Sequence, residues 1–322
     1  MTFPSLAVRT LRGLALAACC AGLLNACGGS TSQVSRFQPQ RILAFGDELN
    51  FLTSDGHKYS VNALKTDKTL DCETSPIWVQ YMAKQLYGKV FSQCVGSGLD
   101  IGAFNLAAVG SRVDDFATQI YSYTSNSGFQ STDLVTVLVG MHDVMDLYRL
   151  YDGSNKDAVV AAAQSKGEQL GDATLQIVGT GARVIISTIP DMGLTPYALQ
   201  QKTDVGDDRP EVLTAMTDAF NRGMRLKFIN LDGSQLGLLM ADDLIRGDVA
   251  QPAAFGFNNS TTAACTTALP NCNIDTVVSE AATASNALPN NSHLWADELH
   301  PGAAFHNQLG TQAVNRVVSL PF

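Results

Sequence analysis

Short apolar runs alternate with long helical segments along most of this chain of 322 residues. Residues 133–139 and 183–188 are apolar and rich in β-branched side chains, which is typical of strands buried on both faces. Residues 157–179 and 211–229 have the composition and spacing of helices. Strands that alternate with helices predict an α/β protein, with a doubly wound parallel sheet inside a three-layer α/β/α sandwich. The same reasoning predicts strands at 41–45 and 236–240 and helices at 76–87 and 301–318.

The composition is that of a globular chain, with 45% apolar and 16% charged residues. Residues 41–322 contain no internal repeat and no evident boundary, so we expect one large domain. The formal net charge is −9, and no cluster of Lys or Arg offsets it. This charge argues against a nucleic-acid partner and against adhesion to anionic lipid. Nothing in the sequence indicates an oligomer, and we expect a monomer.

The first 26 residues have the features of a bacterial lipoprotein signal peptide. Arg9 and Arg12 precede a short apolar run, Leu14–Leu24, and Leu24-Asn25-Ala26-Cys27 resembles a lipobox. The resemblance predicts that Cys27 is lipidated, for example with palmitate, and that residues 27–40 form a flexible tether. It places the protein in the bacterial cell envelope, as an outer-membrane or periplasm-facing lipoprotein. The alternative is an ordinary secretory signal with a chance cysteine.

Four cysteines remain in the predicted domain, and they allow three pairings. The pairs Cys72–Cys94 and Cys265–Cys272 close the shortest loops, and we favour them. Free thiols are uncommon in an oxidising compartment. A zinc site is a further alternative, although the spacings do not resemble C-x₂-C.

Two polar motifs directly follow predicted strands. Phe45-Gly46-Asp47-Glu48 ends the first strand, and Gly140-Met141-His142-Asp143 follows the strand at 133–139. The carboxyl ends of parallel strands meet at one edge of the sheet, where ligands of such folds bind, so we expect these motifs to converge. Residues 247–295 lack clear periodicity and lead into Asp297 and His300, and we interpret them as a loop at the mouth of the site.

These motifs resemble the conserved blocks of the SGNH or GDSL-type esterases and lipases. Gly46-Asp47-Glu48 matches the Gly-Asp-Ser block, and Asn105–Gly110 matches the second block. Gly140–Asp143 matches the Gly-x-Asn-Asp block, and Asp297-x-x-His300-Pro301 matches the last one. The resemblance implies an SGNH-hydrolase or flavodoxin-like fold without a cofactor or metal. It also implies action on a small-molecule ester, an acylated sugar or a lipid.

The resemblance also assigns roles to five residues. Asp297 orients His300, and Gly110 with His142 forms the oxyanion hole, although the family has Asn at position 142. Glu48 stands where the family has its nucleophilic serine. Asp47 and Asp143 are expected to brace the neighbouring turns through hydrogen bonds.

A glutamate at position 48 changes the expected chemistry. Its carboxylate is ionised at neutral pH, and it could occupy the oxyanion donors and hold His300 protonated. The leading hypothesis is an altered ester hydrolase in which Glu48 acts as a base on water or as a nucleophile itself. A metal ion held by Glu48, His142 and His300 is a further alternative. The rival hypothesis is an inactive pseudoenzyme that binds an acylated sugar or lipid in the retained pocket.

Other residues have no motif around them. We expect His57, His293 and His306 to be surface or capping residues, Trp78 to lie in the core and Trp295 to pack the loop before Asp297.

Overall fold

The computed structural model describes residues 37–94, 98, 100–282 and 292–319. The predicted signal peptide, Cys27 and tether residues 27–36 lie outside the described residues. The compact domain begins at Phe37, whose ring lies 4.1 Å from the guanidinium carbon of Arg183. Gln40 N donates to Thr132 O at 2.9 Å. Residues 37–40, which we expected to end the tether, are therefore part of the folded domain.

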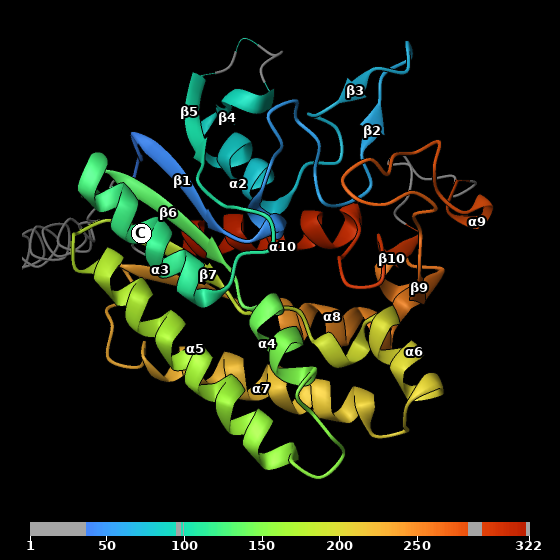
Figure 1. Cartoon of the computed structure of the whole chain (residues 1–322). Helices are drawn as coiled ribbons and strands as arrows, with labels where there is room; N and C mark the ends of the chain where they lie inside the picture. The colour runs from blue at the N-terminus through green and yellow to red at the C-terminus, as the bar shows by residue number, and fades with distance from the viewer. Residues whose placement is uncertain (1–36, 95–97, 99, 283–291, 320–322) are drawn as a thin grey trace, which may run out of the picture. The chain divides into compact units, whose positions relative to one another are not determined.

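A six-stranded parallel sheet forms the centre of the described domain (Figure 1). Its order is β4 (Lys89–Phe91), β5 (Asp100–Asn105), β1 (Arg41–Gly46), β6 (Asp133–Leu138), β7 (Arg183–Ser187) and β8 (Leu236–Leu239). From β1 in the middle of the sheet the chain runs to the edge strand β4, returns to β5 beside β1, crosses to β6 on the other side of β1, and continues outward to β7 and β8. The order reverses between β1 and β6, and ligands of doubly wound sheets bind at such switch points. Gly46 is the register partner of Leu138, so both strands end side by side.

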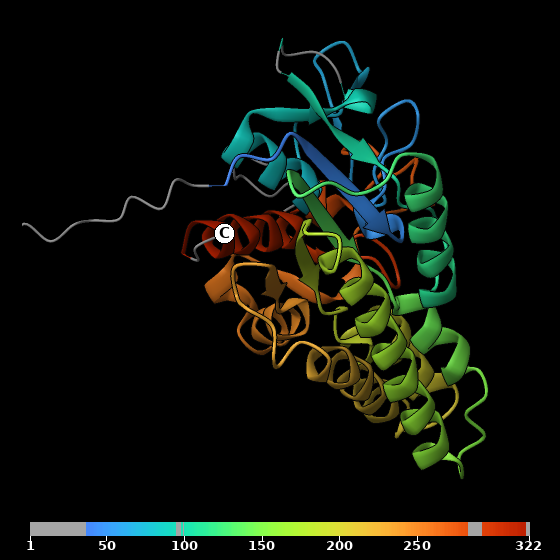
Figure 2. The same ribbon diagram turned by 90° about the vertical axis from the view of Figure 1, so that its left-hand side faces the viewer.

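Helices cover both faces of this sheet, which confirms the predicted three-layer α/β/α fold (Figure 2). One layer contains α3 (Val113–Asn126), α5 (Lys156–Val178) and α7 (Arg209–Leu226). The other contains α2 (Trp78–Tyr87), α8 (Ala241–Ala250) and α10 (Ala303–Ser319). In each half of the fold, long helices thus exclude water from the strands.

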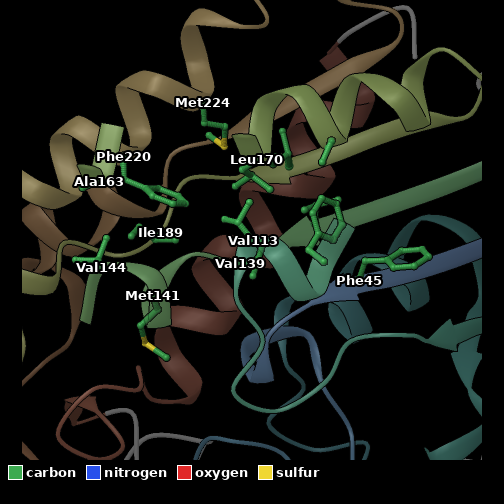
Figure 3. Close-up of a cluster of buried hydrophobic side chains, with 14 of the residues drawn as sticks. Phe45, Val113, Val139, Met141, Val144, Ala163, Leu170, Ile189, Phe220 and Met224 are labelled. Atoms are coloured by element: carbon green, nitrogen blue, oxygen red, sulfur yellow. The ribbon is translucent and has the colours of Figure 1, made fainter. Parts of the chain in front are cut away.

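The alternation of side chains along β1 separates the two cores. Leu43 and Phe45 belong to the cluster under α3, α5 and α7, and Ile42 and Ala44 belong to the cluster under α2, α8 and α10. Figure 3 shows part of the first cluster, with Phe45 on β1, Leu170 on α5 and Phe220 on α7. Consecutive side chains of a strand point to opposite faces of the sheet, so β1 contributes two residues to each core.

The predicted strands and long helices agree with the structure to within a few residues. The sequence did not reveal strands β4 and β5 or the helices α3, α4 (Met141–Tyr148), α6 (Pro196–Asp204) and α8. Short elements complete the domain: a hairpin of β2 (Ala63–Leu64) and β3 (Leu70–Asp71), helix α9 (Ser279–Ala282) and several 3₁₀ turns. Within the described residues no helix is long and apolar enough to cross a membrane.

The described parts of residues 247–295, which are 247–282 and 292–295, contain more secondary structure than we expected. They contain β9 (Asn259–Ala263), which pairs in parallel with β10 (His293–Trp295) just before Asp297. Trp295 is fully buried, and its Nε1 donates to Ser260 O at 3.0 Å. The pairing escapes sequence analysis because its two strands are about thirty residues apart and each is short.

Two of the expected surface histidines are in fact buried. His293 lies in β10, and its Nδ1 is 3.1 Å from Ser292 Oγ. His306 is fully enclosed on the inner face of α10, where burial and the charge of Lys58 lower its pKa to about 3. A neutral imidazole fits such an apolar position better than its charged form does.

Both favoured disulfides form, Cys72–Cys94 and Cys265–Cys272, with Cα–Cα distances of 5.6 Å and 5.8 Å. They exclude the zinc alternative for these cysteines. The first pair closes a separation of 22 residues and the second a separation of 7 residues.

Removing each disulfide tests their unequal loop lengths. In the chain-entropy model, Cys72→Ala/Cys94→Ala lowers the free energy of unfolding by about 3 kcal/mol, and Cys265→Ala/Cys272→Ala lowers it by about 2 kcal/mol. Urea unfolding of both double variants measures the difference. A larger loss from the shorter loop would contradict this ordering.

Candidate active site

Close packing of β1 against β6 creates the turn that carries Glu48. Gly46 has φ of 118°, and a Cβ there would lie 2.0 Å from Leu138 O, so the position requires glycine. Asp47 N donates to Leu138 O at 3.0 Å, and a 3₁₀ turn over Glu48–Asn50 follows. The Asp47 side chain caps this turn by accepting from Leu49 N at 3.1 Å.

Asp47 is fully buried directly beside the site. Burial and then the charge of Glu48 raise its pKa well above the ordinary value. Among the described residues, its Oδ2 has no hydrogen-bond partner. The environment thus favours the neutral acid at Asp47, which leaves Glu48 as the charged carboxylate of the turn.

Two amide side chains that sequence analysis missed hold the turn from both sides. Gln119, on α3, accepts from Gly46 N and donates to Gly46 O, both at 3.3 Å. Asn50 Nδ2 donates to Phe45 O at 2.7 Å, and Asn50 Oδ1 accepts from Trp78 Nε1. No motif marks these residues, because their partners are main-chain atoms or distant side chains.

The Glu48 carboxylate receives three hydrogen bonds from the residues that the sequence analysis assigned to the site. Gly110 N donates to Oε2 at 2.9 Å. His142 Nε2 and His300 Nε2 lie 2.6 Å and 2.9 Å from Oε1. Since a carboxylate only accepts hydrogen bonds, Nε2 of His142 and Nε2 of His300 each carry a proton. Glu48 is 2% exposed, so the side chain is enclosed by these donors.

The donors come from three parts of the chain that meet at the carboxyl edge of the sheet, near the start of α4 (Figure 1). His142 lies in the first turn of α4, after Gly140 with φ of 129°. A Cβ at Gly140 would lie 2.1 Å from the Phe220 ring, so the helix can start this close to α7 only with glycine there.

The Asp297–His300 pair is complete. Both carboxylate oxygens of Asp297 lie 2.9 Å from His300 Nδ1. Asp297 Oδ1 also accepts from Leu299 N and from His300 N, at 2.9 Å and 2.7 Å. Asp297 therefore fixes both the backbone turn and the ring of His300, whose other nitrogen points at Glu48.

Asp143 connects the site to α3. Its Oδ2 accepts from Val113 N at 2.9 Å, which satisfies a free donor in the first turn of that helix. Burial raises the pKa of Asp143 to about 6, although this hydrogen bond and Lys166 oppose the shift. Asp143 thus has a bracing position beside the site and does not contact Glu48 among the hydrogen bonds of the described residues.

The electrostatics make Glu48 and His300 an ion pair. Burial alone raises the pKa of Glu48, but the hydrogen bonds from His142 and His300 outweigh it and hold the pKa well below its usual range. Burial alone lowers the pKa of His300, but Asp297 and Glu48 raise it to about 10. A protonated His300 cannot accept a proton at neutral pH, so the arrangement lacks a general base at this position.

The raised pKa of His300 also fixes the sign of its contribution to folding. This stabilising contribution is fully present below pH 6.5, the ordinary pKa of histidine, and is lost as the pH rises through about 10.

Within the described residues, no group of three or more His, Cys, Asp or Glu side chains is arranged to hold a metal ion.

A family model described as GDSL-like Lipase/Acylhydrolase matches residues 42–312. The chain belongs to this family. The match covers the sheet from Ile42 onward and all the site residues described above. No curated protein is significantly similar to the chain in sequence.

Three solved structures align with most of the chain at low sequence identity. A lipolytic protein of the G-D-S-L family from Veillonella parvula is 11% identical with a TM-score of 0.41, over 85% of this chain and 96% of that one. An acetylxylan esterase from Geobacillus stearothermophilus is 13% identical with a TM-score of 0.42, over 88% and 96%. An extracellular lipase from Streptomyces rimosus is 13% identical with a TM-score of 0.43, over 87% and 99%.

The ion pair can be tested directly by NMR of the imidazole nitrogens. We expect His300 to stay protonated from pH 6 to pH 9 in the unaltered protein, because its pKa is about 10. In Glu48→Gln the pKa of His300 should fall, since one of its two carboxylate partners is lost. A neutral His300 at pH 7.5 in the unaltered protein would contradict the ion pair.

Proposed function

We propose that this member of the GDSL-like lipase/acylhydrolase family is a binding protein for an ester-bearing ligand, an acylated sugar or lipid, and does not turn that ester over. The observation that carries the proposal is the hydrogen bond from Gly110 N to Glu48 Oε2, with both histidines on the other oxygen. The carboxylate occupies the donors that a serine-type esterase keeps for its oxyanion.

Serine-type acyl transfer needs a nucleophile, a free oxyanion hole and a neutral histidine base. Here the nucleophile position holds a carboxylate with both oxygens engaged, the donors are occupied and the pKa of His300 is about 10. Loss of the nucleophile alone costs about 10⁶-fold in turnover in a serine protease. The three defects act on the same step, so little ordinary esterase activity is expected.

The retained cluster supports a role in binding. Glu48, His300 and Asp297 form a largely buried charged group, and apolar residues of similar size would often be at least as stable. Burying these charged groups costs free energy. A site that recognises a ligand would account for their presence.

Hydrolysis through Glu48 remains the second candidate. The complete Asp297–His300 pair favours it, because a protonated His300 at 2.9 Å from Glu48 could serve as the acid while Glu48 activates water. The lowered pKa of Glu48 makes it a weak base, and this is why we place binding first.

We also propose that the protein is exported and anchored through lipid on Cys27, and acts as a monomer. Structural disulfides, of which this domain has two, are common in exported proteins and rare in the cytosol.

In a bacterial host, Cys27→Ser should abolish incorporation of labelled palmitate and release the protein from the membrane fraction. Unchanged labelling of that variant would contradict the lipobox.

Restoring the serine tests the binding proposal. On short-chain nitrophenyl esters we expect activity near background for the unaltered protein. Glu48→Ser should raise kcat/KM by at least about 100-fold, because it frees the oxyanion donors and supplies a nucleophile. Adding His142→Asn should raise it further, since the family has asparagine at this position.

His300→Ala provides the matched control. Combined with Glu48→Ser, it should remove the gained activity, because His300 is the imidazole that Asp297 orients toward position 48. Activity of the unaltered protein that disappears in His300→Ala alone would overturn the binding proposal and favour the hydrolytic candidate.

A further inference from the structure

Two half-buried aromatic rings extend from His300. The Tyr59 ring lies 6.1 Å from the His300 ring, at an interplanar angle of 51°. The Phe51 ring lies 6.3 Å from Tyr59, at 61°. Neither ring belongs to the hydrophobic clusters of the described domain. The hydroxyl of Tyr59 makes no hydrogen bond within the part of the chain that the structure describes, so it is available to a ligand.

A buried lysine, Lys58, holds the segment 58–62 that carries Tyr59 in place. Lys58 is 0% exposed, and its Nζ donates to the carbonyl oxygens of Cys72, Thr74 and Ser75, at 3.3 Å, 2.8 Å and 3.0 Å. All three donors of the ammonium group are therefore used. A buried lysine is costly unless its donors are paired, so this arrangement fixes the segment strongly.

Asn62 holds the same segment from its other end. Its Oδ1 accepts from Lys58 N at 2.9 Å. Its Nδ2 donates to Pro270 O at 2.8 Å and to Cys272 O at 2.9 Å, across to the second disulfide loop. The side chains at positions 58, 60, 61 and 62 are buried, whereas Tyr59 is partly exposed.

Ser60 connects this segment directly to the site. Its Oγ donates to Pro301 O at 3.2 Å, and Pro301 follows His300 in the chain. The position of Tyr59 relative to His300 is thus fixed by buried hydrogen bonds on both sides. A ring that is preorganised in this way loses little conformational entropy when a ligand binds.

We propose that Tyr59 and Phe51 form a stacking subsite for a sugar ring of an O-acylated saccharide, whose ester group lies at His300. The inference rests on the proposed function and selects the saccharide from the two ligand classes named there. The C–H face of a sugar ring packs on an aromatic ring, and its hydroxyls can bond to the free Tyr59 hydroxyl and to Asp297, whose side chain is 32% exposed.

The surroundings of the two rings favour a sugar over an acyl chain. Thr53 and His57 lie in the same turn, and the charged His300 and Asp297 lie beside Tyr59. An acyl chain laid over this surface would remove polar and charged groups from water without replacing their hydrogen bonds. A saccharide provides donors and acceptors for the same groups.

Isothermal titration of the full chain with partly O-acetylated cellopentaose tests the subsite. Tyr59→Ala should weaken binding at least tenfold, because the stacking face is lost. Tyr59→Phe should stay within about threefold of the unaltered protein, since it keeps the ring. Tyr121→Ala is the matched control: Tyr121 is 76% exposed on α3, and its loss should leave binding unchanged. Circular dichroism melting of each variant confirms that it is folded.

Equal affinity of folded Tyr59→Ala and the unaltered protein would overturn the subsite. Binding of monodecanoylglycerol in place of the saccharide would also overturn it, in favour of an acyl-chain site. These outcomes are separate from the esterase assay, since binding is measured without turnover. Hydrolysis of an ester by the unaltered protein would refute the proposed function. It would not decide the subsite, because the loss of saccharide affinity in Tyr59→Ala is measured separately.

Discussion

The rest of the site depends on the three hydrogen bonds that the Glu48 carboxylate accepts. It joins the end of β1, the loop that carries Gly110, the start of α4 and the turn of His300. One buried anion thereby satisfies the donors of Gly110, His142 and His300. Asp297 and this contact with Glu48 together raise the pKa of His300 to about 10, so that His300 is not a base at neutral pH. The residues that the sequence motifs predicted for the site do meet, and they meet around a carboxylate.

Much of this arrangement follows from local sequence. The apolar runs at 133–139 and 183–188 specify buried strands, and strand order in a parallel sheet places their carboxyl ends together. The contact between Glu48 and His300 follows from that edge and from the family motifs. The disulfide pairing follows from loop length alone, because both sequences that separate the cysteines are short.

The features that escaped prediction are buried or half-buried polar side chains that form hydrogen bonds with distant main-chain atoms. Lys58, Asn62 and Gln119 each resemble an ordinary surface residue in the sequence, and their partners are backbone groups that only the folded chain brings near. His306 was misplaced for a related reason, since its neighbours on α10 do not reveal which face is buried. These hydrogen bonds decide how rigidly Glu48 and Tyr59 are presented, and they carry no motif.

A high-resolution crystal structure of the unliganded protein at pH 7 tests the central claim most directly. We expect the Glu48 carboxylate to lie within hydrogen-bond distance of Gly110 N and of both histidine Nε2 atoms. A Glu48 side chain turned away from these donors, with water on Gly110 N and His142, would contradict the account. The oxyanion donors would then be open to a substrate, and hydrolysis would become the better explanation of the site.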